Sequence, residues 1–196
     1  EWQPEAVESL LRRDPEDWRN FADELVTQLR DADCGGVLID WQLVDPVYQP
    51  ELSRFIAFLS DALHQEELEL WLAIPMGNDI ALYDLDALAP HVDRFLATLY
   101  DENGENDEPG PPASLPWFVE WLEVIMPHGH PDQWVIGLGN YGYAWPETGG
   151  AETIGFADAM TRVRALNNPD LATAPPLYSP NFSYSFGDEV HRLWFL

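Results

Sequence analysis

The sequence contains no lysine and only one cysteine. Its nine basic residues are all arginines, and they stand against 35 acidic residues, which gives a formal net charge of −26. Nucleic-acid phosphates need a basic face and anionic membrane surfaces attract basic segments, so this charge argues against both as partners. Because Cys34 is alone, no disulfide can form within the chain, and we expect a small buried side chain there.

Long apolar runs are also missing. No segment approaches the roughly 20 apolar residues that cross a bilayer, and the acidic segment 1–13 shows no secretory leader. Hydrophobic residues make up 46% of the 196 residues, which suffices for one sizeable core and predicts a single domain over residues 1–196. The five histidines show no metal-ligand spacing, and we expect no metal and no cofactor.

Apolar runs alternate along the chain with amphipathic stretches of helical period. Helices are expected over 14–34, 50–67, 83–92, 114–126 and 155–166, and strands over 36–41, 68–77, 93–102, 133–145 and 190–196. This alternation predicts an α/β fold in which helices cover a parallel sheet.

Polar and aromatic residues cluster where the expected strands end. The clusters are Asp40-Trp41-Gln42, Met76-Gly77-Asn78-Asp79, Tyr100-Asp101-Glu102 and Asn140-Tyr141-Gly142-Tyr143. In a (β/α)8 TIM barrel these ends share one mouth, where the chemistry is done. An open doubly wound sheet usually has a glycine-rich loop after its first strand, and "DWQLVDP" is not one, so the barrel is favoured.

The number of expected strands is smaller than a barrel requires. About five parallel strands can be counted, whereas a closed barrel has about eight. The sequence therefore predicts the C-terminal part of a barrel, strands four to eight, with the missing strands before residue 1.

The strand ends resemble those of the family 18 glycoside hydrolases, which are chitinase-like barrel enzymes. The fourth strand of that family carries D-x-x-D-x-D-x-E, and "GGVLIDWQ" places Gly35, Leu38, Asp40 and Gln42 at those four positions. Two of the three aspartates are absent, and the acid has become an amide.

Three further segments extend the resemblance over most of the chain. The family's sixth strand ends in M-x-Y-D, and "TLYD" keeps Tyr100 and Asp101 with Thr98 in place of the methionine. "GLGNYGYAW" matches the tyrosine-bearing end of the seventh strand, and Trp194 is the candidate for the tryptophan of the eighth. "GNYGYAW" and "EPGPPAS" resemble the branch found beside polysaccharide deacetylase and glycosyltransferase modules in bacterial fusion proteins.

The resemblance implies a site for a β-linked polysaccharide or oligosaccharide that contains N-acetylglucosamine. Family 18 enzymes use substrate assistance, in which a glutamate protonates the leaving oxygen and the N-acetyl carbonyl attacks the anomeric carbon. By this resemblance the catalytic positions are Asp40, Gln42, Tyr100 and Asp101, and the substrate-binding positions are Asn78, Glu102, Tyr141, Tyr143, Trp145 and Trp194. It also implies neighbouring deacetylase or glycosyltransferase modules and an extracellular or cell-envelope location.

Gln42 decides how the resemblance translates into activity. An amide has no acidic proton near neutral pH, so the expected module binds glycan with weak or absent hydrolysis. A natural substitution and an engineered Glu→Gln trap both fit, although the losses at Gly35 and Leu38 favour the natural one. Two alternatives stay open: an active glycosidase that uses Glu102 or Asp79 instead, and a non-catalytic scaffold domain.

Overall fold

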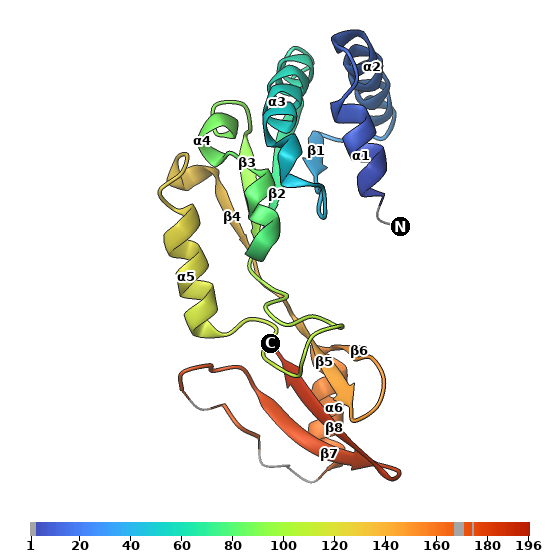
Figure 1. Ribbon diagram of the computed structural model, residues 1–196, viewed down its shortest axis with the longest axis vertical. Coiled ribbons are helices and arrows are strands. Elements are labelled where there is room, and N and C mark those ends of the chain that lie inside the picture. The colour runs from blue at the N-terminus through green and yellow to red at the C-terminus, as the bar shows by residue number, and fades with distance from the viewer. Residues whose placement is uncertain (1–2, 167–170, 174) are drawn as a thin grey trace. The chain divides into compact units, whose positions relative to one another are not determined.

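The structure is a computed structural model that describes residues 3–166, 171–173 and 175–196 (Figure 1). It separates into two compact units. The first unit comprises Glu1–Thr98 and Ile125–Ile136, and the second comprises Leu99–Val124 and Gly137–Leu196.

The first unit is built on a parallel sheet. Its strands are β1 (Gly36–Ile39), β2 (Glu69–Pro75), β3 (Arg94–Thr98) and β4 (Trp134–Gly137), in the order β1-β2-β3-β4. β2 pairs in parallel with both β1 and β3, so that Leu38 lies opposite Trp71. The parallel sheet and the α/β class follow the prediction from sequence.

Helices pack on one face of this sheet. They are α1 (Pro4–Leu11), α2 (Pro15–Asp31), α3 (Gln49–His64) and α4 (Leu85–Leu88), with the 3-10 turns η1 (Pro46–Tyr48), η2 (Gly77–Leu82) and η3 (Pro131–Gln133). Asp14 caps α2 as expected, because its carboxylate accepts the backbone N–H groups of Glu16 and Asp17. Trp18 of α2 meets Phe55 of α3 edge to face, with ring centroids 5.4 Å apart.

The two faces of the parallel sheet differ in burial. Leu70, Leu72 and Ile74 alternate along β2 and are fully buried, whereas Leu38 of β1 is 43% exposed. Alternate residues of a strand point to opposite faces, so one face of the sheet forms the core with the helices. The other face carries Leu38 and, farther along the same strand direction, Asp40.

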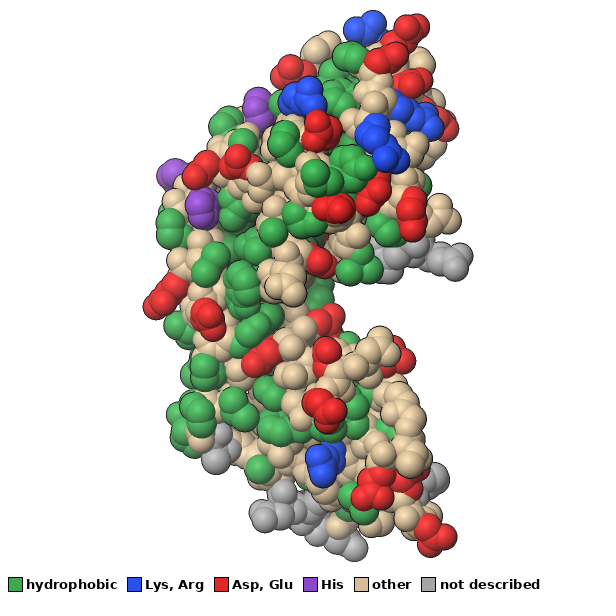
Figure 2. Space-filling model, viewed as in Figure 1, with side chains coloured by type: hydrophobic (Ala, Val, Ile, Leu, Met, Phe, Trp, Pro, Cys, Tyr) green, Lys and Arg blue, Asp and Glu red, His purple; other side chains and the backbone are tan. Residues whose placement is uncertain are grey.

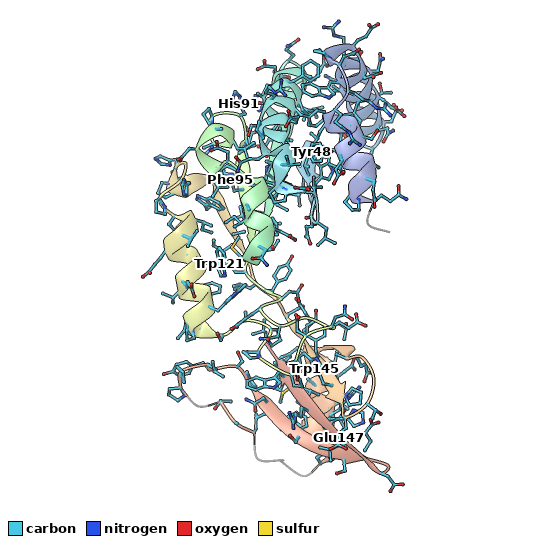
Figure 3. The ribbon with its side chains drawn as sticks, viewed as in Figure 1. Tyr48, His91, Phe95, Trp121, Trp145 and Glu147 are labelled. Atoms are coloured by element: carbon cyan, nitrogen blue, oxygen red, sulfur yellow. The ribbon has the colours of Figure 1, made fainter. Side chains whose placement is uncertain are left out.

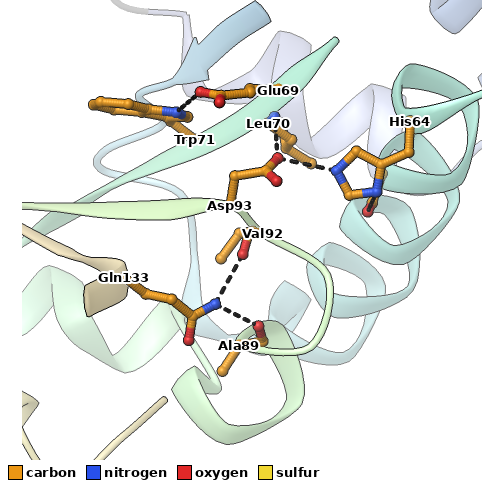
Figure 4. Close-up of polar contacts among 9 residues, drawn as sticks. His64, Glu69, Leu70, Trp71, Ala89, Val92, Asp93 and Gln133 are labelled. Carbon is orange, nitrogen blue, oxygen red and sulfur yellow. Dashed lines mark hydrogen bonds and ion pairs between the residues drawn. The ribbon is translucent and has the colours of Figure 1, made fainter. Parts of the chain in front are cut away.

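Polar side chains fix the edge of the sheet where β2 and β3 begin (Figure 4). Asp93 accepts the backbone N–H of Leu70 at 2.8 Å and contacts His64 Nε2 at 2.9 Å. Gln133 donates to the carbonyls of Ala89 and Val92, each at 2.9 Å. These contacts lie at the amino ends of the strands, the edge that serves stability rather than chemistry in barrel folds.

The second unit contains an antiparallel sheet with the strand order β6-β5-β8-β7. Its strands are β5 (Tyr141–Pro146), β6 (Glu152–Gly155), β7 (Asn181–Phe186) and β8 (Glu189–Phe195); α6 (Phe156–Ala165) covers one face, and α5 (Leu115–Ile125) falls in this unit except for its last residue. The core under α6 includes Ala144, Phe182 and Leu193. Figure 1 shows α6 behind this sheet.

Residues 190–196 are therefore not the eighth strand of a parallel sheet, and that prediction is wrong. β8 pairs antiparallel with both β5 and β7. The hairpin that joins β7 to β8 turns at Gly187, whose φ of 65° suits glycine. A short apolar run does not reveal its direction, and the alternating "NFSYSF" that pairs with it was not recognised as a strand.

Two smaller expectations also change. The strand expected over 133–145 divides into β4 and β5, and Cys34 is exposed in the turn before β1 rather than buried. Among the described residues, no helix is both long enough and apolar enough to cross a bilayer.

Candidate functional site

The end of β1 presents two polar side chains on the same side of the chain. Gln42 Nε2 donates to Asp40 Oδ1 at 2.9 Å. Trp41 points the other way, and its ring lies 5.4 Å from that of Phe55 on α3. The alternation that sequence predicted for Asp40, Trp41 and Gln42 is thus confirmed.

Tyr83 holds this strand end in place, and sequence reasoning missed it. Its hydroxyl donates to the backbone carbonyl of Trp41, and the residue is only 5% exposed. Burial raises the pKa of Tyr83 well above its ordinary value, and the charges of Asp40 and then Asp79 raise the pKa further. The hydroxyl therefore stays protonated close to two carboxylates. Only the tertiary contact reveals this role, since "ALYDLD" carries no motif.

Asn78 and Asp79 lie on η2, directly after β2. Asn78 is exposed, and Asp79 is partly buried. The effect of Asp79 on the pKa of Tyr83 places its carboxylate near the anchored end of β1. Asn78 and Asp79 thus belong to the same unit as Asp40 and Gln42.

The centre of the second group is the carboxylate of Asp101. Its Oδ1 accepts hydrogen bonds from the hydroxyls of Tyr141 and Tyr143, the latter at 2.8 Å. Burial is the largest cause that raises the pKa of both tyrosines, and the hydrogen bond to Asp101 and its charge follow. Both phenols are therefore protonated donors to the carboxylate of Asp101.

Aromatic rings continue from this carboxylate along β5. Centroid distances are 6.1 Å from Tyr100 to Tyr141, 5.6 Å from Tyr141 to Tyr143 and 5.5 Å from Tyr143 to Trp145. Trp145, labelled in Figure 3, donates its indole N–H to the carbonyl of Asp107 at 2.9 Å. Tyr143 and Trp145 are 7% and 5% exposed, so Tyr100 and Tyr141 offer more ring surface to a ligand.

Trp194 joins the same aromatic row, although its strand is not the one expected. It lies opposite Tyr143 in the pairing of β5 with β8, and it packs against the buried cluster of Tyr143, Trp145 and Ala151. The antiparallel sheet thus brings Trp194 to Tyr143. Its contact with a sugar stays a prediction.

Glu102 is engaged at the start of α5. Its carboxylate accepts the backbone N–H and, at 3.0 Å, the hydroxyl of Ser114. Residue 114 immediately precedes α5, so Glu102 satisfies donors at a helix start. This contact explains the position of Glu102, and its role at a glycan site stays a prediction.

Backbone geometry is unusual at the end of each group. Leu43, next to Gln42, has a φ of 60°, and Asp101 has a φ of 65°. This left-handed region costs a non-glycine residue of the order of 1–2 kcal/mol, and aspartate tolerates it better than leucine. Strained residues of this kind cluster at ligand sites.

The predicted residues divide into two groups according to the unit in which each lies. The first holds Asp40, Gln42 and Asn78, and the second holds Tyr100, Asp101, Glu102, Tyr141, Tyr143, Trp145 and Trp194. A common mouth shared by both groups stays a prediction. In the part of the chain that the structure describes, no set of three or more His, Cys, Asp or Glu side chains could hold a metal ion.

Comparisons with known proteins agree with this description. The family model "Glycosyl hydrolases family 18" matches residues 8–191. The uncharacterized glycosylase YvbX of Bacillus subtilis is 27% identical over 134 residues, which are 65% of this chain and 39% of that protein.

Solved structures show the same fold at lower identity. A chitinase from Chromobacterium violaceum aligns with a TM-score of 0.88 and 22% identity, over 100% of this chain and 63% of that one. The spore cortex-lytic enzyme SleL of Bacillus cereus aligns with a TM-score of 0.89 and 18% identity, over 100% of this chain and 48% of that one.

The chain spans about two fifths of the curated relatives that it matches, 39% of one and 40% of the other. The family model, by contrast, covers nearly all of this chain. The aligned structures have the barrel-type α/β fold that the strand ends predicted. On the match over residues 8–191, the chain belongs to the glycosyl hydrolases of family 18.

Proposed function

We propose that this chain is a glycan-binding module that engages a β-linked polymer of N-acetylglucosamine and hydrolyses it weakly or not at all. The proposal rests on Gln42, which the sequence resemblance aligns with the family's acid and whose amide donates to Asp40 at 2.9 Å. The names of the relatives, a glycosylase, a chitinase and a cortex-lytic enzyme, support a glycan as the ligand.

The expected defect is confined to proton transfer. Substrate-assisted cleavage needs a group that protonates the leaving oxygen while the N-acetyl carbonyl attacks the anomeric carbon. The amide of Gln42 cannot give up a proton near neutral pH, and loss of a positioned general acid costs about 10²- to 10⁴-fold in rate. Asp40 still has the position from which the family's aspartate orients the acetamido group.

Binding can survive this defect. An amide nitrogen carries two N–H groups, and Gln42 uses one on Asp40, so the other can reach a glycosidic oxygen. In the second group, the carboxylate of Asp101 accepts hydrogen bonds from two tyrosine hydroxyls. Tyr141 and Tyr100 add ring surface on which a sugar can stack.

A working hydrolase with a substitute acid is the second candidate. Asp79 is the better of the two carboxylates, because its charge reaches Tyr83 beside Asp40. Glu102 is already engaged by Ser114. The remaining parts of the proposal are an extracellular or cell-envelope location and neighbouring polysaccharide-modifying modules.

A combined binding and cleavage assay tests the proposal. Chitotetraose should bind in calorimetry and leave no shorter products in mass spectrometry. Tyr141→Ala should weaken binding about tenfold through loss of ring contact. Trp121→Ala, a substitution on α5 outside both groups, is the control and should leave affinity unchanged.

Two results would overturn this view. Shorter products that vanish in Asp79→Asn would establish the substitute acid. No heat of binding from any chitooligosaccharide would favour a scaffold domain.

A further inference from the structure

A cavity of about 700 Å³ lies in the first unit between the α1–α2 turn and the start of α3. Its lining includes Arg12, Arg13, Arg54, Glu51, Tyr48 and Trp18. Its volume is in the range of small-ligand sites, about 300–1,000 Å³. Neither the group around Asp40 nor the group around Asp101 contributes to it.

The cavity is lined by several arginines, although the chain as a whole is very acidic. Three of the nine arginines line it, although 35 acidic residues are available to neutralise them. Among the described residues, Arg12 and Arg13 form no ion pair, while Arg54 pairs with Glu51 at 2.8 Å. Figure 2 shows blue arginine side chains gathered over the helices α1 to α3.

One of these arginines is held in place by a neutral partner. Arg12 Nη1 donates to the hydroxyl of Tyr48 at 2.9 Å, and the guanidinium carbon lies 5.5 Å from the centroid of the Tyr48 ring. Figure 3 labels Tyr48 where the chain enters α3. This guanidinium donates one N–H to a neutral hydroxyl. Its positive charge is not neutralised by that contact, and its other N–H groups can donate to an oxyanion.

The cavity lies close along the chain to the candidate acid position. Tyr48 follows Gln42 by six residues, which span at most about 20 Å when fully extended. This upper bound is within the length of a glycan polymer, so one polymer is long enough to contact both positions. The overall negative charge does not prevent this, because charges beyond about 8 Å are largely screened at physiological salt.

We infer that the Arg12–Arg13–Arg54 cavity binds an oxyanion substituent of the glycan, so that the preferred ligand is an acidic saccharide rather than a neutral one. The saccharide part rests on the proposed function, whereas the anion part rests on the arginines alone. Carboxylate and phosphate share the required chemistry, since both accept paired N–H donors of a guanidinium. Glu51 does not oppose the anion strongly, because Arg54 already neutralises it.

The test compares saccharides that differ only in charge. The probes are chitotetraose, a tetrasaccharide of alternating N-acetylglucosamine and N-acetylmuramic acid, and chitotetraose 6-phosphate. We expect one of the acidic probes to bind at least about tenfold more tightly than chitotetraose at low salt, and the stronger one identifies the anion. The advantage should shrink as salt is added.

Variants then locate the effect. Arg13→Gln should remove most of the acidic advantage, about fivefold, and it carries little folding risk because Arg13 is exposed. Arg12→Gln should act in the same direction. Arg19→Gln is the matched control, since Arg19 is an exposed arginine on the adjacent helix α2 and does not line the cavity.

The outcomes separate this inference from the proposed function. If chitotetraose binds and neither acidic probe binds more tightly, the cavity inference is wrong while the proposed function stands. If the acidic probes bind through Arg13 and chitotetraose does not bind at all, the neutral-polymer proposal fails and the anion site stands. An acidic advantage that survives Arg13→Gln and Arg12→Gln places the anion elsewhere and overturns the inference.

Discussion

The two residue groups differ in the hydrogen bonds that their carboxylates accept. Asp40 is exposed and receives one hydrogen bond from the amide of Gln42. Asp101 receives two from tyrosine hydroxyls whose burial raises their pKa. In the alignment suggested by sequence, the first group has an amide at the position of the family's acid, whereas the second keeps the tyrosine and aspartate of its motif. The proposed function predicts from this comparison that binding is retained while proton delivery is missing.

The largest effect is expected when the acidic residues of the family motif are restored in the first group. Gln42→Glu, combined with Gly35→Asp and Leu38→Asp, should raise the rate of chitotetraose cleavage at least about 10²-fold, because a general acid is returned. The added groups have room, since a Cβ at Gly35 would meet nothing within 4 Å and Leu38 is 43% exposed. Product formation is followed by mass spectrometry.

The same restoration has a direct control. Gly35→Asp with Leu38→Asp, leaving Gln42 in place, should stay inactive because the acid is still missing. If the double variant is as active as the triple variant, Gln42 is not the limiting residue and the assignment of the acid position is wrong.

Removing charge from each carboxylate gives the next largest effect. Asp101→Asn should lower the free energy of unfolding by about 1–3 kcal/mol, because two charge-assisted hydrogen bonds become neutral ones. Asp40→Asn should change it by less than about 0.5 kcal/mol, because Asp40 accepts only one hydrogen bond, from the amide of Gln42. Urea unfolding measures both. Equal effects of the two substitutions would show that the difference between the groups is not energetic.

Sequence predicted some features of the two groups and missed others. The β1 end was predictable because a two-residue alternation fixes which side Asp40 and Gln42 occupy. The association of Asp101 with Tyr141 was also predictable, since strand-end motifs converge. The roles of Tyr83 and Glu102 were not predictable, because each depends on hydrogen bonds to a residue outside its own sequence motif, Trp41 and Ser114 respectively. The antiparallel direction of β8 depends on its β7 partner, which no local pattern in the last residues contains.

The tyrosines give the two groups a shared dependence on pH. An unfolded tyrosine ionises near pH 10, and the folded pKa of Tyr83, Tyr141 and Tyr143 lies above that value. Above pH 10 the unfolded chain therefore loses protons that the folded chain keeps. The contribution of these tyrosines to stability should not change with pH below about pH 9. The free energy of unfolding should then fall as the pH rises above about 10.

Phenylalanine substitutions show how much each unit contributes to the fall in the free energy of unfolding at alkaline pH. Tyr143→Phe and Tyr83→Phe should each flatten the fall in urea-unfolding free energy between pH 9 and pH 11 relative to the unmodified chain. Tyr178→Phe, at an exposed tyrosine outside both groups, is the control and should leave the slope unchanged. A slope that responds equally to all three substitutions would contradict the assigned burial effect.

The smallest expected effect is a change in stability that has opposite signs in the two groups. Leu43 and Asp101 share the left-handed backbone conformation, with φ values of 60° and 65°. Leu43 is 62% exposed, so Leu43→Gly removes strain and little packing and should stabilise the chain by up to about 1 kcal/mol. Asp101→Gly relieves the same strain but leaves the hydroxyls of Tyr141 and Tyr143 without their acceptor, and it should destabilise. Thermal unfolding measures the sign in each case. Stabilisation by both substitutions would mean that the two tyrosine hydrogen bonds contribute less than the backbone strain that Asp101 tolerates to make them.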